Sequence, residues 1–133
     1  MIITDDFTGL NKLLKQLFPD TDHQLCLVHL MRNLKGNLDK EIYEEFGNLL
    51  QEIYLCPSFE AAYSKLNCFI ENNIATYNNF YSKYLKDRAD NYLAFCKYPQ
   101  NLRPVIRSTN AVEGINNAIE IARRNSGGYF HSE

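Results

Sequence analysis

The chain has 133 residues, of which 45% are hydrophobic and 23% charged, and its formal net charge is −2. This length and composition predict one globular domain, and the charge balance excludes a protein that binds nucleic acid through bulk positive charge. There is no apolar run of about 18 residues and no cleavable apolar leader, so we expect neither a membrane protein nor a secreted one.

The first part of the chain predicts a β-α-β unit. An apolar strand at residues 2–4 is followed by leucines at the spacing of one helical face: Leu10, Leu13, Leu14 and Leu17. Pro19 ends this helix, and the apolar run HQLCLVHL at residues 23–30 predicts a second strand. Strands joined in this way are expected to pair in parallel.

From about residue 29 the hydrophobic pattern becomes helical. We expect a helix that leaves the second strand and stops near Gly36, and a helix with its apolar stripe over 42–53. Ser58 is expected to be the N-cap of the next helix. Further helices are expected over roughly 78–97 and from near Thr109 to about Arg124.

Two parallel strands alone form an unfinished sheet, because parallel sheets need cover on both faces and more strands. We therefore expect the chain to lack the N-terminal half of its sheet, and we expect its open edges to favour association with another chain. We interpret residues 1–133 as one truncated α/β domain, divided into a sheet part (1–28), a helical insertion (29–105) and a last helix with its tail (106–133).

Asp5 and Asp6 follow the first strand, at the end where open α/β sheets collect functional groups. A carboxylate there can bind Mg²⁺. The alternative is that the pair caps the following helix.

Cys26 and His29 are three residues apart, where the second strand gives way to a helix. A structural zinc site needs four ligands, and the sequence contains no second Cys/His pair. A packed thiol and a hydrogen-bonded imidazole are the expected alternative. The four cysteines, at 26, 56, 68 and 96, are expected to be free and mostly buried.

The segment RSTNAVEGINN at residues 107–117 offers Ser108, Thr109 and Asn110 as helix caps, and Glu113 lies in the first turn, where the helix dipole favours an acid. Further on, Arg123 and Arg124 precede GGYF at residues 127–130. These arginines either contact a phosphate backbone or form a solvated helix end.

Three segments together, TDDFTGL, FPDTDHQLCLVHLMRN and FCKYPQNLRPVIRSTNAVEGINN, resemble the catalytic core of the Mutator-like transposases of bacteria and archaea, the IS256 family. The resemblance follows the order and spacing of these motifs over nearly the whole chain. It implies a partial ribonuclease H-like fold with an Asp-Asp-Glu triad and a helical insertion before the helix that carries the glutamate.

By position, the resemblance makes Asp5 the second aspartate of the triad and Glu113 its glutamate, with Asp6 a weaker candidate. The first aspartate is expected upstream of residue 1. The remaining motif residues are also implied by position. Cys26, His29, Asn110 and Asn116 are expected to support the site, and Arg32, Arg123 and Arg124 to contact DNA.

The implied activity is cutting and joining of DNA at transposon ends, with Mg²⁺ or Mn²⁺ in two sites roughly 3.5–4 Å apart. The implied partners are transposon-end DNA and further copies of the full-length protein, in a prokaryotic cytoplasm; neither a membrane nor a small-molecule substrate is expected. With one aspartate missing, this chain alone is expected to hold the ions weakly and to cleave nothing. The alternative is a non-catalytic remnant that binds DNA or a transposase.

Overall fold

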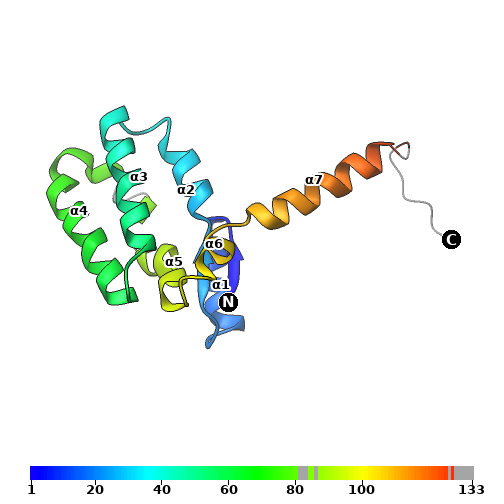
Figure 1. The fold of residues 1–133 in the computed structure, drawn as a ribbon, viewed down its shortest axis with the longest axis horizontal. Helices are drawn as coiled ribbons and strands as arrows, with labels where there is room; N and C mark the ends of the chain where they lie inside the picture. The colour runs from blue at the N-terminus through cyan, green and yellow to red at the C-terminus, as the bar shows by residue number, and fades with distance from the viewer. Residues whose placement is uncertain (81–83, 86, 126, 128–133) are drawn as a thin grey trace.

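The computed structural model describes residues 1–80, 84, 85, 87–125 and 127, without the side chains of 74–78 and 80. The chain begins with β1 (Ile2–Thr4), α1 (Leu10–Leu17) and β2 (His23–Leu25), as Figure 1 shows. The helices α2 (Leu27–Leu34), α3 (Lys40–Tyr54) and α4 (Phe59–Phe80) follow. The last elements are α5 (Ala89–Leu93), the 3-10 helix η2 (Ala94–Lys97), α6 (Arg103–Ile106) and α7 (Asn110–Asn125).

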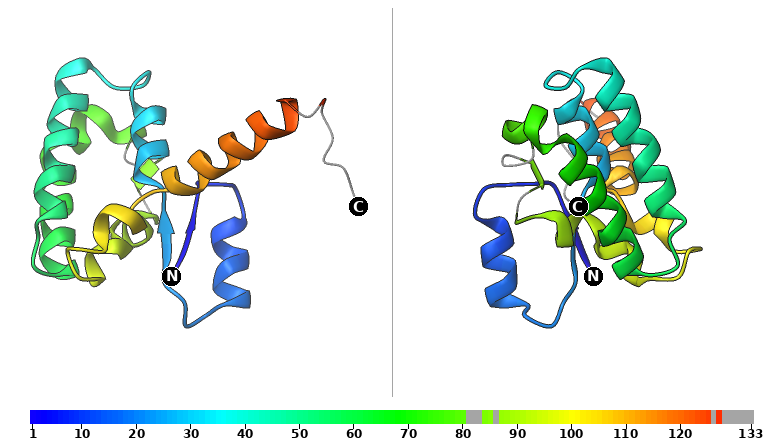
Figure 2. Two further views of the ribbon diagram at one scale, coloured as in Figure 1. Left: turned by 45° about the vertical axis from the view of Figure 1, so that its right-hand side comes forward. Right: turned by 90° about the vertical axis from the view of Figure 1, so that its left-hand side faces the viewer.

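The predicted parallel β-α-β unit is confirmed. β1 pairs with β2 in parallel, and the last pair in the register is Thr4 with Leu25. α1 lies beside the two strands (Figure 2) and buries none of its residues. Within the part of the chain that the structure describes, β1 has no neighbour other than β2, so its second edge is open there.

The second strand is shorter than the sequence predicts, and the following helix starts earlier. β2 ends at Leu25 and α2 begins at Leu27, so the expectation of a strand over 23–30 with a helix from about 29 is wrong. Leu27, Leu30 and Leu34 are all buried. Their spacing places them on one side of a helix, and this packing favours a helix over an extended chain.

Most of the core lies in the helical layer, where α2, α3 and α4 run side by side (Figure 1). Phe46 and Ile53 of α3 are buried against the layer, and the ring of Phe46 lies 5.5 Å from that of Phe69. The predicted cap of α4 is confirmed, since the backbone N–H of Ala61 donates to Ser58 Oγ at 3.2 Å.

The single helix predicted over 78–97 is wrong. α4 ends at Phe80, and α5 begins only at Ala89; residues 81–83 and 86 lie outside the described residues. Asp87 has a φ of 62°, a left-handed conformation that a continuous helix does not contain. The short helix α6 was not predicted from the sequence; Pro104 lies in its first turn, where proline is well tolerated.

Gln24 joins the sheet to the helical layer. Its side chain is fully buried, and its Nε2 donates to the carbonyls of Leu25 (2.7 Å) and Tyr92 (2.9 Å). Its Oε1 accepts the backbone N–H of Phe95 at 2.7 Å. One amide therefore ties β2 to both α5 and η2.

α7 extends away from the rest of the molecule (Figures 1 and 2). None of its 16 residues is buried. Several large apolar side chains on it are at least half exposed: Val112, Ile115, Ile119 and Ile121.

No described helix is both long and apolar enough to cross a lipid bilayer.

Candidate functional site

The ends of β1 and β2 place Asp5 and Cys26 next to each other. Thr4 and Leu25 are paired, so the residues that follow them leave the sheet at the same edge. The backbone N–H of Cys26 donates to the Thr4 carbonyl at 2.9 Å, which extends the ladder by one bond. The position of these two side chains is therefore set by the strand register.

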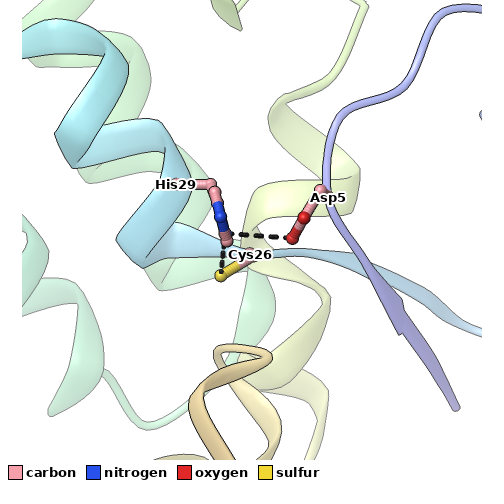
Figure 3. Close-up of side chains that lie close together, drawn as sticks. All are labelled: Asp5, Cys26 and His29. Carbon is pink, nitrogen blue, oxygen red and sulfur yellow. Dashed lines mark hydrogen bonds and ion pairs between the residues drawn. The ribbon is translucent and has the colours of Figure 1, made fainter. Parts of the chain in front are cut away.

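His29 completes this cluster from the first turn of α2, three residues after Cys26. Its Nδ1 lies 2.9 Å from Asp5 Oδ1 and 3.2 Å from Cys26 Sγ. Figure 3 shows the three side chains converging from the end of β1 and the β2–α2 junction. Because α2 starts directly after Cys26, a separation of three residues turns both side chains to the same side of the helix.

Glu113, on the first turn of α7, reaches the other nitrogen of the same imidazole. Its Oε1 lies 3.2 Å from His29 Nε2. Asp5 and Glu113, which are far apart in the sequence, therefore approach opposite sides of one ring. The start of α7 is held near the strands by a backbone hydrogen bond of 3.1 Å from the Leu27 N–H to the Arg107 carbonyl.

Thr109 links the start of α7 to both strand ends. Its backbone N–H and its hydroxyl each donate to Cys26 Sγ at 3.4 Å, and the hydroxyl also lies 3.3 Å from Asp5 Oδ1. The residue was considered only as a helix cap from the sequence. The structure directs its hydroxyl to the site, and the sequence carries no pattern that would have shown this.

These contacts change the protonation of the thiol and the imidazole. Burial alone would raise the pKa of Cys26, but hydrogen bonds from Thr109 and His29 outweigh burial and lower it. The hydrogen bond with Cys26 raises the pKa of His29, burial opposes this, and the charges of Asp5, Cys26 and Glu113 raise it further. Both pKa shifts are therefore toward the charged form of the group, the thiolate of Cys26 and the imidazolium of His29.

Asp6 points to a different partner. Its Oδ2 lies 3.3 Å from Nη1 of Arg88. Helix α1 is preceded by Gly9, which has a φ of 83°, and no side chain caps it. The alternative in which Asp5 and Asp6 cap this helix is therefore wrong.

The predicted DNA-contact residues lie in two places. Arg32 is beside the site, with Nη1 3.8 Å from Glu113 Oε1, and its side chain is 60% exposed. Arg123 and Arg124 are near the far end of α7, where both bond to Glu120 at 2.7 and 3.1 Å.

The two asparagines of the motif, Asn110 and Asn116, are exposed on α7. The GGYF segment that follows the arginines falls outside the described residues except for Gly127.

The site offers two sets of possible metal ligands. Asp5 and Glu113 supply carboxylate oxygens, with side chains 32% and 36% exposed. Asp5, Cys26 and His29 supply oxygen, sulfur and nitrogen atoms that all lie within 4.8 Å of one another. The sequence showed the Cys/His pair but not its third neighbour, because that neighbour depends on the strand register.

Comparison with known proteins gives one consistent result. A family model described as "Transposase, Mutator family" matches residues 1–131. The chain is 32% identical over 120 residues to the transposase for insertion sequence element IS1201 of Lactobacillus helveticus. The aligned residues cover 90% of this chain and 32% of that protein.

Two further transposases are similar. The transposase for IS905 of Lactococcus lactis is 32% identical over 122 residues, covering 90% of this chain and 30% of that protein. The transposase for IST2 of Acidithiobacillus ferrooxidans is 34% identical over 113 residues, covering 85% and 38%. The chain therefore spans about a third of the length of these relatives.

Proposed function

Because the chain belongs to the Mutator family of transposases, we propose that Asp5 and Glu113 are two carboxylates of an Asp-Asp-Glu site that cuts and joins DNA at transposon ends. The observation that carries this proposal is the approach of both carboxylates to one imidazole, His29, from opposite sides. Two acids from a strand end and a distant helix meet at one place, as metal-dependent phosphodiester chemistry requires.

The two acids fit Mg²⁺ or Mn²⁺ by their chemistry. Both ions prefer carboxylate oxygens, and both side chains are about one-third exposed, which leaves room for water and a phosphate oxygen. When bound, the ions supply an activated water or 3′-hydroxyl and neutralise charge on the leaving oxygen.

The other residues of the site hold these acids and face the substrate. Thr109 positions Asp5 through its hydroxyl, and His29 keeps the acids on opposite sides of its ring. Arg32 is more than half exposed beside Glu113, where a guanidinium can bind a phosphate of the DNA. Arg123 and Arg124 are candidate DNA contacts at a second place, along α7.

The family resemblance adds finer proposals. We propose that β1, β2 and α7 belong to a ribonuclease H-like domain of the IS256 type, and that α2–α6 form its helical insertion. The third carboxylate is proposed to come from protein outside these 133 residues. The full-length protein is proposed to act on DNA as a homo-oligomer.

Manganese binding tests the two acids directly. Mn²⁺ added to the ¹⁵N-labelled chain is expected to broaden the amide signals of Asp5, His29 and Glu113 first, because its paramagnetism acts at short range. Asp5→Asn and Glu113→Gln should each reduce this broadening. Glu41→Gln, which removes an exposed acid at the start of α3, is the control and should leave it unchanged. Equal broadening in the wild-type chain and in all three variants would contradict the proposal.

DNA binding separates this proposal from the alternative of a non-catalytic module. Labelled DNA titrated into the chain should bind more tightly with Mg²⁺ than without it, and Asp5→Asn should remove the difference. We expect no metal-dependent nicking by the 133-residue chain alone. Binding that is the same with and without Mg²⁺ would favour the DNA-binding module instead.

A further inference from the structure

We propose that Asp5, Cys26 and His29 form a binding site for a thiophilic divalent cation such as Zn²⁺, with one coordination position left for water or substrate. The proposal concerns metal binding and does not depend on the proposed nuclease chemistry, although Asp5 belongs to both. Its three ligands come from the residue after β1, the β2–α2 junction and α2.

The distances between the ligand atoms suit such an ion. From the usual bond lengths, the ligand atoms of a tetrahedral zinc site lie roughly 3.3–3.6 Å apart. His29 Nδ1 lies 2.9 Å from Asp5 Oδ1 and 3.2 Å from Cys26 Sγ, and the three atoms lie within 4.8 Å of one another. The two distances at His29 Nδ1 are shorter than this range by a few tenths of an ångström, so small outward shifts of Asp5 and Cys26 would bring them into it.

The same nitrogen of His29 faces both other ligands. Asp5 Oδ1 and Cys26 Sγ approach Nδ1, as two ligands of one ion would, whereas Glu113 approaches Nε2. Cys26 and Glu113 therefore lie on opposite nitrogens, as in a nucleophilic triad, but with Cys26 only 1% exposed the sulfur has little room for a bulky organic electrophile. A cation would receive electron pairs from the sulfur, the nitrogen and the oxygen together.

The surrounding contacts are those that support metal ligands. A histidine bound to a metal through one nitrogen usually donates its other N–H to a carboxylate or carbonyl, and His29 Nε2 lies 3.2 Å from Glu113 Oε1. The sulfur of Cys26 accepts a hydrogen bond from the Thr109 backbone N–H. It also shares the single proton of the Thr109 hydroxyl with Asp5, and both contacts stabilise the thiolate needed for coordination.

The ligand types select the metal. A thiolate and an imidazole favour Zn²⁺, Co²⁺ or similar ions, whereas Mg²⁺ prefers oxygen alone. Coordination needs both Cys26 Sγ and His29 Nδ1 without a proton, so binding would release to solvent any proton that this pair holds. It would also occupy Asp5, so a thiophilic ion and Mg²⁺ bound through Asp5 should compete.

Cobalt is the probe of choice, because Co²⁺ bound to a thiolate absorbs in the near ultraviolet and tetrahedral Co²⁺ absorbs in the visible. Titration of Co²⁺ into the reduced, folded 133-residue chain is expected to produce both absorptions and to saturate at one ion per chain. Added Zn²⁺ should remove them by displacement. Absence of the near-ultraviolet band from the folded wild-type chain would overturn the proposal.

Variants assign the ligands. Cys26→Ser should abolish the near-ultraviolet band, whereas Cys68→Ser, which changes an exposed cysteine on α4, should retain it. Asp5→Asn and His29→Asn should raise the dissociation constant for Co²⁺ by more than about tenfold, since loss of a supporting contact alone costs that much. Asp6→Asn is the matched control for Asp5, because Asp6 is directed to Arg88.

Far-ultraviolet circular dichroism of each variant, recorded without metal, establishes that it is folded before the titration is interpreted. A band that persists in folded Cys26→Ser, or an Asp6→Asn effect as large as that of Asp5→Asn, would show that Co²⁺ binds elsewhere and would reject the site. Failure of Mn²⁺ to broaden the signals of Asp5 and Glu113 would reject the proposed nuclease chemistry while leaving the cobalt result intact.

Discussion

Arg103 is a buried cation that binds backbone carbonyls. Its side chain is 2% exposed, and its guanidinium donates to four carbonyl oxygens at 2.7–3.0 Å. These carbonyls belong to Tyr54, Cys56, Cys96 and Tyr98. The planar fork of arginine can serve several acceptors at once, so one residue holds the end of α3 against η2 and α6.

We predict that Arg103→Met lowers the free energy of unfolding by about 3–5 kcal/mol, because it leaves several buried carbonyls without a donor. Chemical denaturation measures this loss. Arg124→Met, which changes a side chain 74% exposed, should stay within about 0.5 kcal/mol of wild type. Equal effects of the two substitutions would contradict the role given to Arg103.

Asp22 gives a prediction for pH. Hydrogen bonding to Lys97 lowers the pKa of Asp22 below its ordinary value of 3.8, burial opposes this, and the hydroxyl of Tyr98 lowers it further. A carboxyl with a lowered pKa stabilises the fold above its unfolded-state pKa, and this stabilisation is lost as the pH falls through the folded-state pKa.

We therefore expect Asp22→Asn to be less stable than wild type at pH 7, by less than about 1 kcal/mol because the pair is partly exposed. The difference should shrink below about pH 4. Thermal unfolding from pH 7 to pH 2.5 measures it. Asp20→Asn, an exposed neighbour, serves as the control, and a difference that grows in acid would contradict the assignment.

At the scale of the elements, the sequence predicted those with an unambiguous apolar period. The strand at residues 2–4, the helix beginning at Leu10, α3 and α7 were placed within a few residues. The end of β2 was misplaced, because LCLVHL is apolar at nearly every position and so fits either a strand or a buried helix. The break near Asp87 left no sign in the local apolar pattern.

Gln24 shows how an element is fixed by packing that no periodicity reveals. We predict that Gln24→Leu lowers the free energy of unfolding by about 2–4 kcal/mol, because the Phe95 N–H and the Tyr92 carbonyl lose a buried partner. Urea denaturation measures the change. Gln16→Leu, at an exposed position of α1, should have little effect; a loss below about 0.5 kcal/mol at Gln24 would refute the argument.

At the scale of the whole molecule, α7 differs from the other long helices because it buries no side chain. Isolated helices of this length are marginal in water. We predict that amides of α7 exchange with solvent through openings of about 1 kcal/mol or less, whereas amides near Ile53 and Leu66 in the core require far larger openings. Hydrogen exchange followed by NMR tests this, and core-like protection in α7 would contradict it.

The candidate site was only partly predictable from the sequence, because several of its contacts depend on how distant segments pack together. The motifs identified Asp5, Glu113, Cys26 and His29 as residues of interest, because residue types and spacing are visible in a sequence. The sequence did not show that His29 lies between the two acids or that Thr109 contacts Asp5 and Cys26. Those contacts depend on the register of β1 with β2 and on the position at which the chain returns to the strands before α7.

The direct passage from β2 into α2 through the single residue Cys26 has a consequence for tolerance to insertion. Because no loop separates β2 from α2, the hydrogen-bond ladder of the strands determines the rotation of α2 about its own axis. One amino acid added after Cys26 would turn the helix by about 100° and swing the imidazole out of reach of Asp5. Lengthening the connection between α1 and β2 would leave that alignment untouched, so this part of the chain should accept length changes on one side of β2 and reject them on the other.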